Sequence, residues 1–213
     1  MTTRIGLLFF PGMTHLDTTA PQQVLSAMDD VQLHHLWKTK EPVTSDSGLT
    51  FVPTTTLSEC PNLDVLFVGG GGGQIPLMSD DEVLSFLARQ GAQARYVTAV
   101  CTGSLLLGAA GLLRGRRATT HWAYTDLLAT FGATYEPARV VVDGNRVTGG
   151  GVTAGLDFAL RLVALLEGDD AARAITLRYE YDPAPPFACG HPDRADPALV
   201  AAMRARARAG VPG

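Results

Sequence analysis

The sequence predicts an α/β fold in which a mostly parallel sheet is covered by helices on both faces, a three-layer sandwich. Short, continuous apolar runs alternate along the chain with longer stretches of helical periodicity. This alternation is typical of parallel strands joined by crossover helices, because strands buried on both faces are apolar throughout. Apolar residues make up 46% of the 213 residues and charged residues 18%, so the chain has enough apolar material for a substantial core.

Apolar runs and periodicity place the elements in order along the chain. Strands are expected at Ile5–Phe10, Val31–Trp37, Asp64–Val68 and Arg95–Val100. Helices are expected at Asp17–Met28, Asp80–Arg89, Leu105–Ala110, Trp122–Phe131, Gly155–Leu166 and Asp170–Tyr179. Turn signals predict a hairpin over Thr44–Val52 outside the main alternation, and a second pair of strands, Arg139–Val142 and Arg146–Thr148.

The length favours one domain over two small ones, so we expect a single α/β domain over residues 1–213. Its last part, residues 183–213, differs in composition from the rest. Residues 183–192 are rich in proline, and the chain becomes helical again from Asp196 to about Arg208. We therefore interpret this part as a segment and a helix appended to the sandwich.

Charge and cysteine content exclude several classes of protein. A formal charge of −4 and a pI of about 5.7 give no electrostatic footprint for nucleic acid or an anionic membrane. The apolar run Ile5–Phe10 is too short for a signal peptide or a membrane span, which predicts a cytoplasmic protein. The three cysteines form no CxxC pair and the histidines show no ligand spacing, so neither a disulfide framework nor a metal site is expected.

In parallel sheets, ligands bind outside the carboxyl ends of the strands, and one segment there contains five successive glycines, Gly69 to Gly73. Such a run costs conformational entropy, so we interpret it as a loop whose N–H groups approach a substrate. The dinucleotide fingerprint fits badly because its sixth position is Gln74, and the lysine of a phosphate loop is absent. No nucleotide cofactor is expected. The alternative is a flexible surface loop.

Cys101 directly follows a predicted strand and precedes a helix of small and apolar residues, as in a nucleophile elbow. At a helix start, free N–H groups and the helix dipole favour a thiolate. The N–H of Thr102 is a candidate oxyanion donor, and a glycine N–H from Gly70, Gly71 or Gly72 is a second. The alternative is a buried structural cysteine, since free cysteine is among the most buried residue types.

Several motifs resemble those of the ThiJ/PfpI superfamily and occur in its order: Gly12–Asp17 with Pro21, Ala99–Ser104, Thr120–Trp122 and Gly150–Asp157. The resemblance extends from Ile5 to about Arg178 and implies a flavodoxin-like sandwich, a homodimer and no cofactor. Within the superfamily, the chain is most similar to enzymes that add water to isonitriles. It implies that Cys101 is the nucleophile, Asp17 the acidic partner and Thr102 a supporting residue.

The resemblance also implies a mechanism and a substrate site. Cys101 would attack the isonitrile carbon to give a thioimidate, with Asp17 as acid, and water would then release the formamide. The residues expected to bind the small-molecule substrate are Gly70, Gly71, Gly72, Gln74, Ile75, His121 and Trp122. For Asp17 alone, an ordinary helix N-cap is the competing interpretation.

Other members of the superfamily supply the competing functions. The protease-like branch has a histidine directly after the cysteine, where this chain has Thr102, and the glyoxalase-like branch has a glutamate in place of Asp17. A glyoxalase-like or redox-sensing, protective role of Cys101 remains the alternative. About thirty residues follow Tyr181, too few for the helix-turn-helix region of related regulators.

Overall fold

The computed structural model describes residues 2–209, so Met1 and residues 210–213 of the expected domain lie outside the described residues. Its centre is a seven-stranded sheet with the order β10-β11-β7-β6-β1-β2-β5. All neighbouring strands are parallel except β10 and β11, which pair antiparallel. The strands are β1 (Thr3–Leu8), β2 (Val31–Trp37), β5 (Thr55–Thr56), β6 (Val65–Val68), β7 (Tyr96–Val100), β10 (Val140–Asp143) and β11 (Arg146–Gly149).

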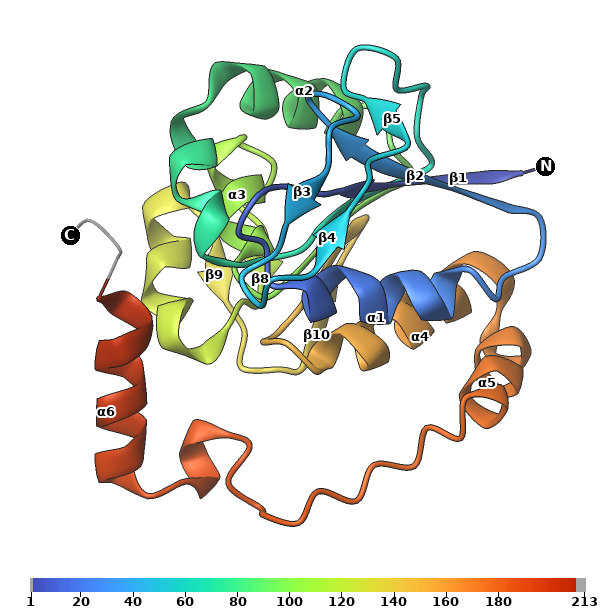
Figure 1. Ribbon diagram of the computed structural model, residues 1–213. Helices are drawn as coiled ribbons and strands as arrows, with labels where there is room; N and C mark the ends of the chain where they lie inside the picture. The colour runs from blue at the N-terminus through green and yellow to red at the C-terminus, as the bar shows by residue number, and fades with distance from the viewer. Residues whose placement is uncertain (1, 210–213) are drawn as a thin grey trace.

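Helices cover both faces of this sheet, as Figure 1 shows. On one face lie α1 (His15–Leu25), α4 (Ala154–Glu167) and α5 (Asp169–Arg178); on the other lie α2 (Asp81–Gly91) and α3 (Gly103–Ala109). Every residue of β6 is buried, and Val97, Ala99 and Val100 of β7 are fully buried. Burial on both faces is the reason these strands are apolar throughout, and the expected flavodoxin-like arrangement is confirmed.

Shorter elements surround the sheet. Two small sheets pair β3 (Val43–Thr44) with β4 (Thr50–Phe51) and β8 (Arg117–Ala118) with β9 (Thr134–Tyr135). The first is the hairpin expected over Thr44–Val52. The 3₁₀ segments are η1 (Gly72–Gln74), η2 (Pro76–Ser79), η3 (Trp122–Phe131) and η4 (Pro192–Arg194). The α-helix expected at Trp122–Phe131 is therefore wrong in type, because the backbone leaves helical geometry at Tyr124 (φ −128°, ψ 15°).

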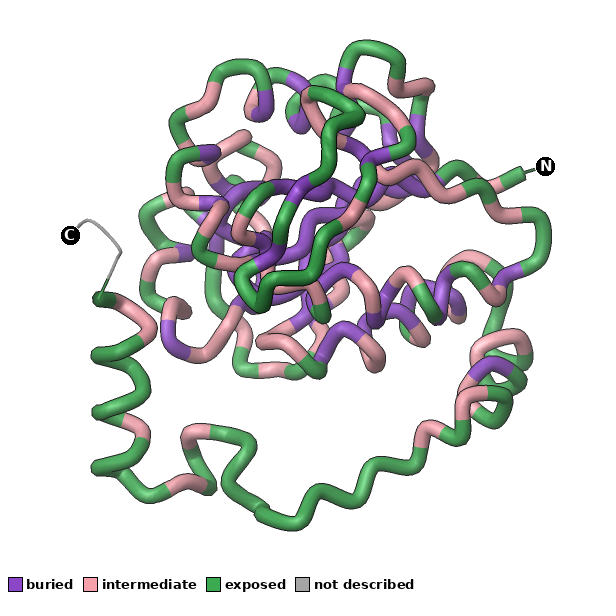
Figure 2. The backbone as a smooth tube through the Cα atoms, in the orientation of Figure 1, coloured by how far each residue is buried: buried purple, intermediate pink, exposed green. Residues whose placement is uncertain are grey.

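The C-terminal segment runs around the outside of the sandwich before it returns to it (Figure 1). Residues 182–191 are exposed at every position, as the continuous exposed stretch in Figure 2 shows. The last helix, α6 (Pro197–Arg208), has no buried residue and packs against η3. Within residues 2–209, no helix combines the length and apolar character that crossing a bilayer requires.

Candidate active site

Cys101 occupies a tight turn between β7 and α3, and its φ of 58° lies in the left-handed region. A non-glycine residue in that region costs free energy, so the surrounding structure must hold it there. The Cys101 N–H donates to the carbonyls of Gly149 (3.1 Å) and Gly150 (3.0 Å). The Cys101 carbonyl accepts a hydrogen bond from Thr120 Oγ1 at 2.8 Å. The predicted strand-to-helix elbow is confirmed, and these bonds fix its backbone.

Asp17 lies in the first turn of α1 and is fully buried. Its Oδ2 accepts a hydrogen bond from the Gly70 N–H at 3.1 Å, whereas its buried Oδ1 has no hydrogen-bond partner among the described residues. The helix begins at His15, two residues before the expected start, with Thr14 at the N-cap position. The N-cap interpretation of Asp17 is therefore wrong, since its side chain points to the glycine loop.

The Asp17 carboxyl and the Cys101 thiol form an interacting buried pair. Burial raises the pKa of Asp17 to about 7, partly offset by the Cys101 thiol and the Gly70 N–H. Burial and the Asp17 carboxylate raise the pKa of Cys101 well above its usual value. The expectation of an acidic thiol is wrong, because desolvation outweighs the N–H groups at the start of a short helix. From about pH 7 upward the pair therefore shares one proton.

The glycine loop packs against this pair with bare backbone. The Gly70 N–H bonds to Asp17, the Gly71 N–H donates to Thr102 Oγ1 at 3.1 Å, and Gly72 lines the cavity beside Cys101. A Cβ on Gly71 would lie 2.3 Å from Thr14 N, and one on Gly73 would lie 1.8 Å from Pro11 O. The flexible-loop alternative is wrong, since close packing requires glycine at these positions.

Two neighbouring glycines of this loop should respond differently to alanine. A Cβ on Gly70 would lie 2.5 Å from Thr102 Oγ1 and 3.0 Å from Asp17 Oδ2, whereas a Cβ on Gly72 would meet no atom within 4 Å. We expect Gly70→Ala to lower the free energy of unfolding by about 1–3 kcal/mol through overpacking, and Gly72→Ala to leave it within about 0.5 kcal/mol. Denaturant unfolding measures both. Equal losses in the two variants would contradict this account of the loop.

A cavity of about 210 Å³ opens beside Cys101. Its wall is mostly apolar, and the residues that line it are Thr14, Gly71, Gly72, Gln74, Ile75, Met78, Cys101, Thr102, Leu105, His121, Tyr124, Leu127, Val152 and Ala207. Of the residues expected to bind substrate, Gly71, Gly72, Gln74, Ile75 and His121 are among them. Gly70 lies behind the wall, hydrogen-bonded to Asp17. Trp122 is not in this wall; its side chain lines two neighbouring cavities instead.

Sequence reasoning missed several wall residues, and only some of them had a usable signal. Leu105 lies in the first turn of α3, directly after the turn that holds Cys101. Tyr124 and Leu127 lie one and two turns beyond His121 on η3. Ala207 comes from α6, more than a hundred residues after the cysteine, and nothing in the sequence signals its position.

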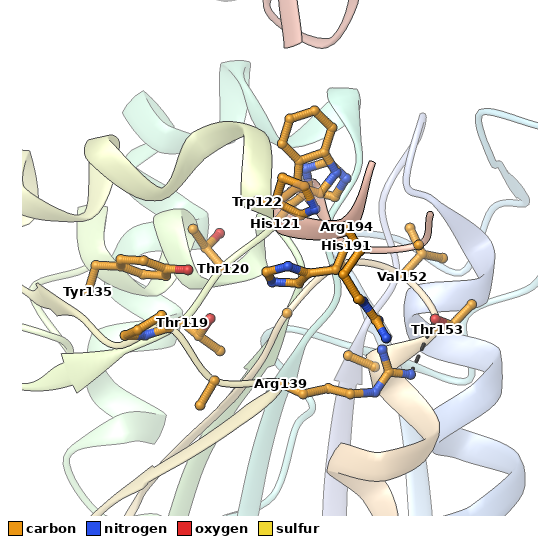
Figure 3. Close-up of a pocket in the computed structure, with 17 residues that line it drawn as sticks. Thr119, Thr120, His121, Trp122, Tyr135, Arg139, Val152, Thr153, His191 and Arg194 are labelled. Atoms are coloured by element: carbon orange, nitrogen blue, oxygen red, sulfur yellow. Dashed lines mark hydrogen bonds between the residues drawn. The ribbon is translucent and has the colours of Figure 1, made fainter. Parts of the chain in front are cut away.

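A larger cavity of about 400 Å³ adjoins the first and shares His121 and Val152 with it. Figure 3 shows Arg139 bonded to Thr153 at one side and His191 and Arg194 of the C-terminal segment across from it. His121 Nδ1 accepts a hydrogen bond from the Ala123 N–H at 3.2 Å and caps η3. Burial lowers the pKa of His121. The His121 imidazole is therefore uncharged at neutral pH, and it lies between the two cavities.

α6 is held over the Cys101 cavity by contacts at its last turn. Tyr124 Oη donates to the Ala207 carbonyl, and the Arg208 guanidinium forms an ion pair with Asp126. Arg208 Nε also donates to the Ala123 carbonyl at 2.8 Å. Because no α6 residue is buried, these polar contacts position the helix. Ala207 becomes part of the cavity wall as a result.

Arg208→Gln is expected to loosen this wall and to expose Cys101. An exposed ion pair contributes up to about 1 kcal/mol, so we expect Cys101 to react roughly two- to fivefold faster with N-ethylmaleimide. Arg206→Gln is the matched control, since Arg206 lies on the same turn but is exposed. Peptide mapping by mass spectrometry separates Cys101 from the exposed Cys189. Equal rates in the two variants would contradict the role assigned to Arg208.

The remaining candidate groups lie away from this pair. Cys60 is half-buried, and burial raises its pKa to about 11. His15 Nδ1 bonds to Ser47 Oγ at 2.9 Å, outside the cavity wall. Within residues 2–209, no three His, Cys, Asp or Glu side chains are grouped so that they could hold a metal ion.

A parallel α/β sandwich with a cysteine in a left-handed strand-to-helix turn, paired with a buried carboxyl, defines a class of cysteine-elbow proteins. The chain belongs to the DJ-1/PfpI family, whose model matches residues 3–165.

Two comparisons extend over nearly the whole chain. It is 57% identical over 207 residues to a protein named isonitrile hydratase from Pseudomonas putida, which covers 97% of this chain and 91% of that protein. A crystal structure of a ThiJ/PfpI family protein from Pseudomonas syringae has a TM-score of 0.95 and 46% identity, covering 98% of this chain and 87% of that one.

A third relative has a different architecture. The HTH-type transcriptional regulator GbdR from Pseudomonas aeruginosa is 32% identical over 160 residues, which span 74% of this chain and 43% of the regulator. The shared part is therefore less than half of that protein.

Proposed function

We propose that this protein is an isonitrile hydratase, which adds water to R–N≡C and releases an N-substituted formamide. The observation that carries the proposal is the 57% identity to the Pseudomonas putida protein of that name over 97% of the chain. The Cys101–Asp17 pair beside an apolar cavity supports it, because the reaction needs a nucleophile, a proton donor and a pocket for a hydrocarbon group.

In the first half of the reaction, Cys101 sulfur bonds to the isonitrile carbon. The proton that the pair shares passes through Asp17 to the same carbon, which gives the thioimidate R–N=CH–S–Cys101 and leaves the Asp17 carboxylate. The pKa of about 7 suits Asp17 for this exchange, because neither protonation state is strongly favoured near neutral pH. The Thr102 N–H lies against the Cys101 sulfur, where it stabilises the thiolate form.

In the second half, water adds to the thioimidate carbon and the C=N bond becomes a C–N bond with a proton on nitrogen. The C–S bond then breaks, the hydroxyl proton returns to the pair, and R–NH–CHO leaves. The bonds and protons that change in each step belong to the substrate, the pair and water. The cycle therefore needs no cofactor.

The cavity wall favours a compact hydrocarbon substituent. Ile75, Met78, Leu105 and Leu127 offer apolar contacts, and about 210 Å³ accommodates a ring or a branched chain of a few carbons.

We also propose that the protein is a homodimer. Leu177 and Phe187 support this, because they are 83% and 75% exposed on the isolated chain.

The test is hydration of cyclohexyl isocyanide by the purified protein, with N-cyclohexylformamide followed by chromatography. Steady formation of many equivalents of formamide per protein is the expected result. Methylglyoxal and hydrogen peroxide are assayed in parallel. Turnover of methylglyoxal alone, or stoichiometric oxidation of Cys101 with no turnover, would replace the proposal by a glyoxalase-like or redox-sensing role.

A further inference from the structure

The side chain of Gln74 is buried in the cavity wall, and its amide oxygen has no hydrogen-bond partner within residues 2–209. Gln74 is the last residue of η1 and is 4% exposed, and its Oε1 accepts no hydrogen bond from any described residue. A buried amide oxygen without a partner costs free energy, so such a group is retained where it binds something else. Gln74 also lines the Cys101 cavity, so a polar molecule that enters this cavity is a candidate partner for the amide.

The other polar side chains of the wall are already engaged inside the protein. Thr14 donates to Asp46, Thr102 accepts from the Gly71 N–H, His121 accepts from the Ala123 N–H, and Tyr124 donates to the Ala207 carbonyl. Among the described residues of this wall, the Gln74 amide is thus the side chain left to hold a polar molecule.

The reaction needs a group that hydrogen-bonds to water and positions it, because one water molecule must reach the thioimidate carbon in a mostly apolar cavity. Asp17 is fully buried and is not part of the cavity wall. Its carboxyl can exchange protons with the sulfur and the reacting carbon, yet a water in the cavity needs a wall group to orient it. The side chains of Ile75 and Leu105 have no atom that accepts a hydrogen bond from water, and the Met78 sulfur is only a weak acceptor.

We propose that Gln74 positions the water that hydrolyses the Cys101 thioimidate, an assignment that rests on the proposed function. The Gln74 Oε1 accepts one water hydrogen and directs the oxygen lone pair at the carbon. The new C–O bond forms, the other water proton passes through the Asp17 carboxylate to nitrogen, and the C=N bond becomes single. Gln74 holds the water without taking a proton.

Gln74→Leu tests this assignment, because it removes the amide and keeps a buried side chain of similar bulk. Loss of one orienting hydrogen bond should slow hydrolysis roughly ten- to a hundredfold. With hydrolysis limiting, kcat and KM fall together and kcat/KM, which reports thioimidate formation, is unchanged. Intact-protein mass spectrometry during turnover should show Cys101 carrying the whole isonitrile.

Two further measurements separate this role from a structural one. Because the amide oxygen lacks a protein partner, Gln74→Leu should keep or raise the melting temperature, whereas a structural amide would lower it. Gln74→Glu retains an acceptor oxygen and should show less adduct than Gln74→Leu. Met78→Leu reshapes the same wall, removes only a weakly accepting sulfur and should accumulate no adduct.

The outcomes distinguish the two proposals. If the wild type hydrates isonitriles while Gln74→Leu lowers kcat/KM and shows no adduct, Gln74 binds substrate and the water assignment is wrong. If Gln74→Leu melts at a lower temperature and Gln74→Glu restores nothing, the role is structural. If neither the wild type nor any variant turns over or forms an adduct with cyclohexyl isocyanide, the hydratase proposal itself fails.

Discussion

Replacement of Cys101 by alanine is expected to remove isonitrile hydration, with kcat reduced at least roughly a thousandfold. The thioimidate cannot form without the sulfur, and in the apolar cavity the remaining groups cannot raise the reactivity of the isonitrile carbon enough for water to add directly. Cys101→Ser should fall by a similar factor. Burial already raises the pKa of the thiol, and an alcohol at the same place is far harder to ionise.

The controls for Cys101 are the exposed Cys189 and the backbone of the elbow. Cys189→Ala should keep full activity, since Cys189 is exposed and outside the cavity wall. Cys101→Ala retains a Cβ in the left-handed turn at φ 58° and should fold like the wild type, as circular dichroism can verify. Turnover by Cys101→Ala within tenfold of the wild type would rule out covalent catalysis at this residue.

Asp17→Asn is expected to lower kcat roughly 10²- to 10⁴-fold, because the amide fits the same space and cannot exchange a proton. The wild-type pH profile gives a second readout. The reactive pair holds one proton, so kcat/KM should rise with pH through about 7, where the doubly protonated pair loses its first proton, and should then level off. A profile that falls as pH rises through 7 would mean that the doubly protonated pair reacts.

The same carboxyl affects stability in the direction opposite to most aspartates. Its pKa is about 7 in the folded protein against an ordinary value of 3.8, so the folded state binds the extra proton between these values. The free energy of unfolding therefore decreases as pH rises from about 4 to 7, by an upper value of about 4 kcal/mol.

Asp17→Asn removes this dependence, because the amide stays neutral at every pH. The variant should be more stable than the wild type at pH 8, and the difference should shrink toward pH 4. Thermal unfolding at the two pH values measures it. A variant that is less stable at pH 8 would show that the ionised carboxylate stabilises the fold.

The centre of the sheet could be predicted from the sequence because β6 and β7 are buried on both faces. β6 and β7 lie within a residue of their predicted positions, since their apolar runs end sharply, and β2 has its predicted bounds although it is mostly half-buried. The two-residue strands β5, β8 and β9 were missed, because two residues contain no periodicity. Helical spacing over Trp122–Phe131 revealed neither the 3₁₀ geometry nor the break at Tyr124.

The candidate site was predictable where chemistry and local sequence coincide. Cys101 between a strand and a helix, and the glycine run after β6, were both visible in the sequence. The raised pKa of the Cys101 thiol was not visible in the sequence. It depends on the burial of Cys101 next to Asp17, which comes from a distant segment of the chain. Trp122 was expected in the wall of the Cys101 cavity, but His121 lines both cavities and Trp122 lines only the neighbouring one of the two.

The residues that react and a residue that shapes the cavity come from different parts of the chain, as the position of Ala207 shows. The family model matches residues 3–165, which contain Cys101 and Asp17, whereas Ala207 in the cavity wall comes from a helix beyond that range. The stretch before α6, residues 182–191, is exposed at every position and buries no residue against the sandwich. Changes in this appended part can therefore alter which molecules reach the cysteine while leaving the core untouched, so new substrate preferences can arise without a penalty in folding.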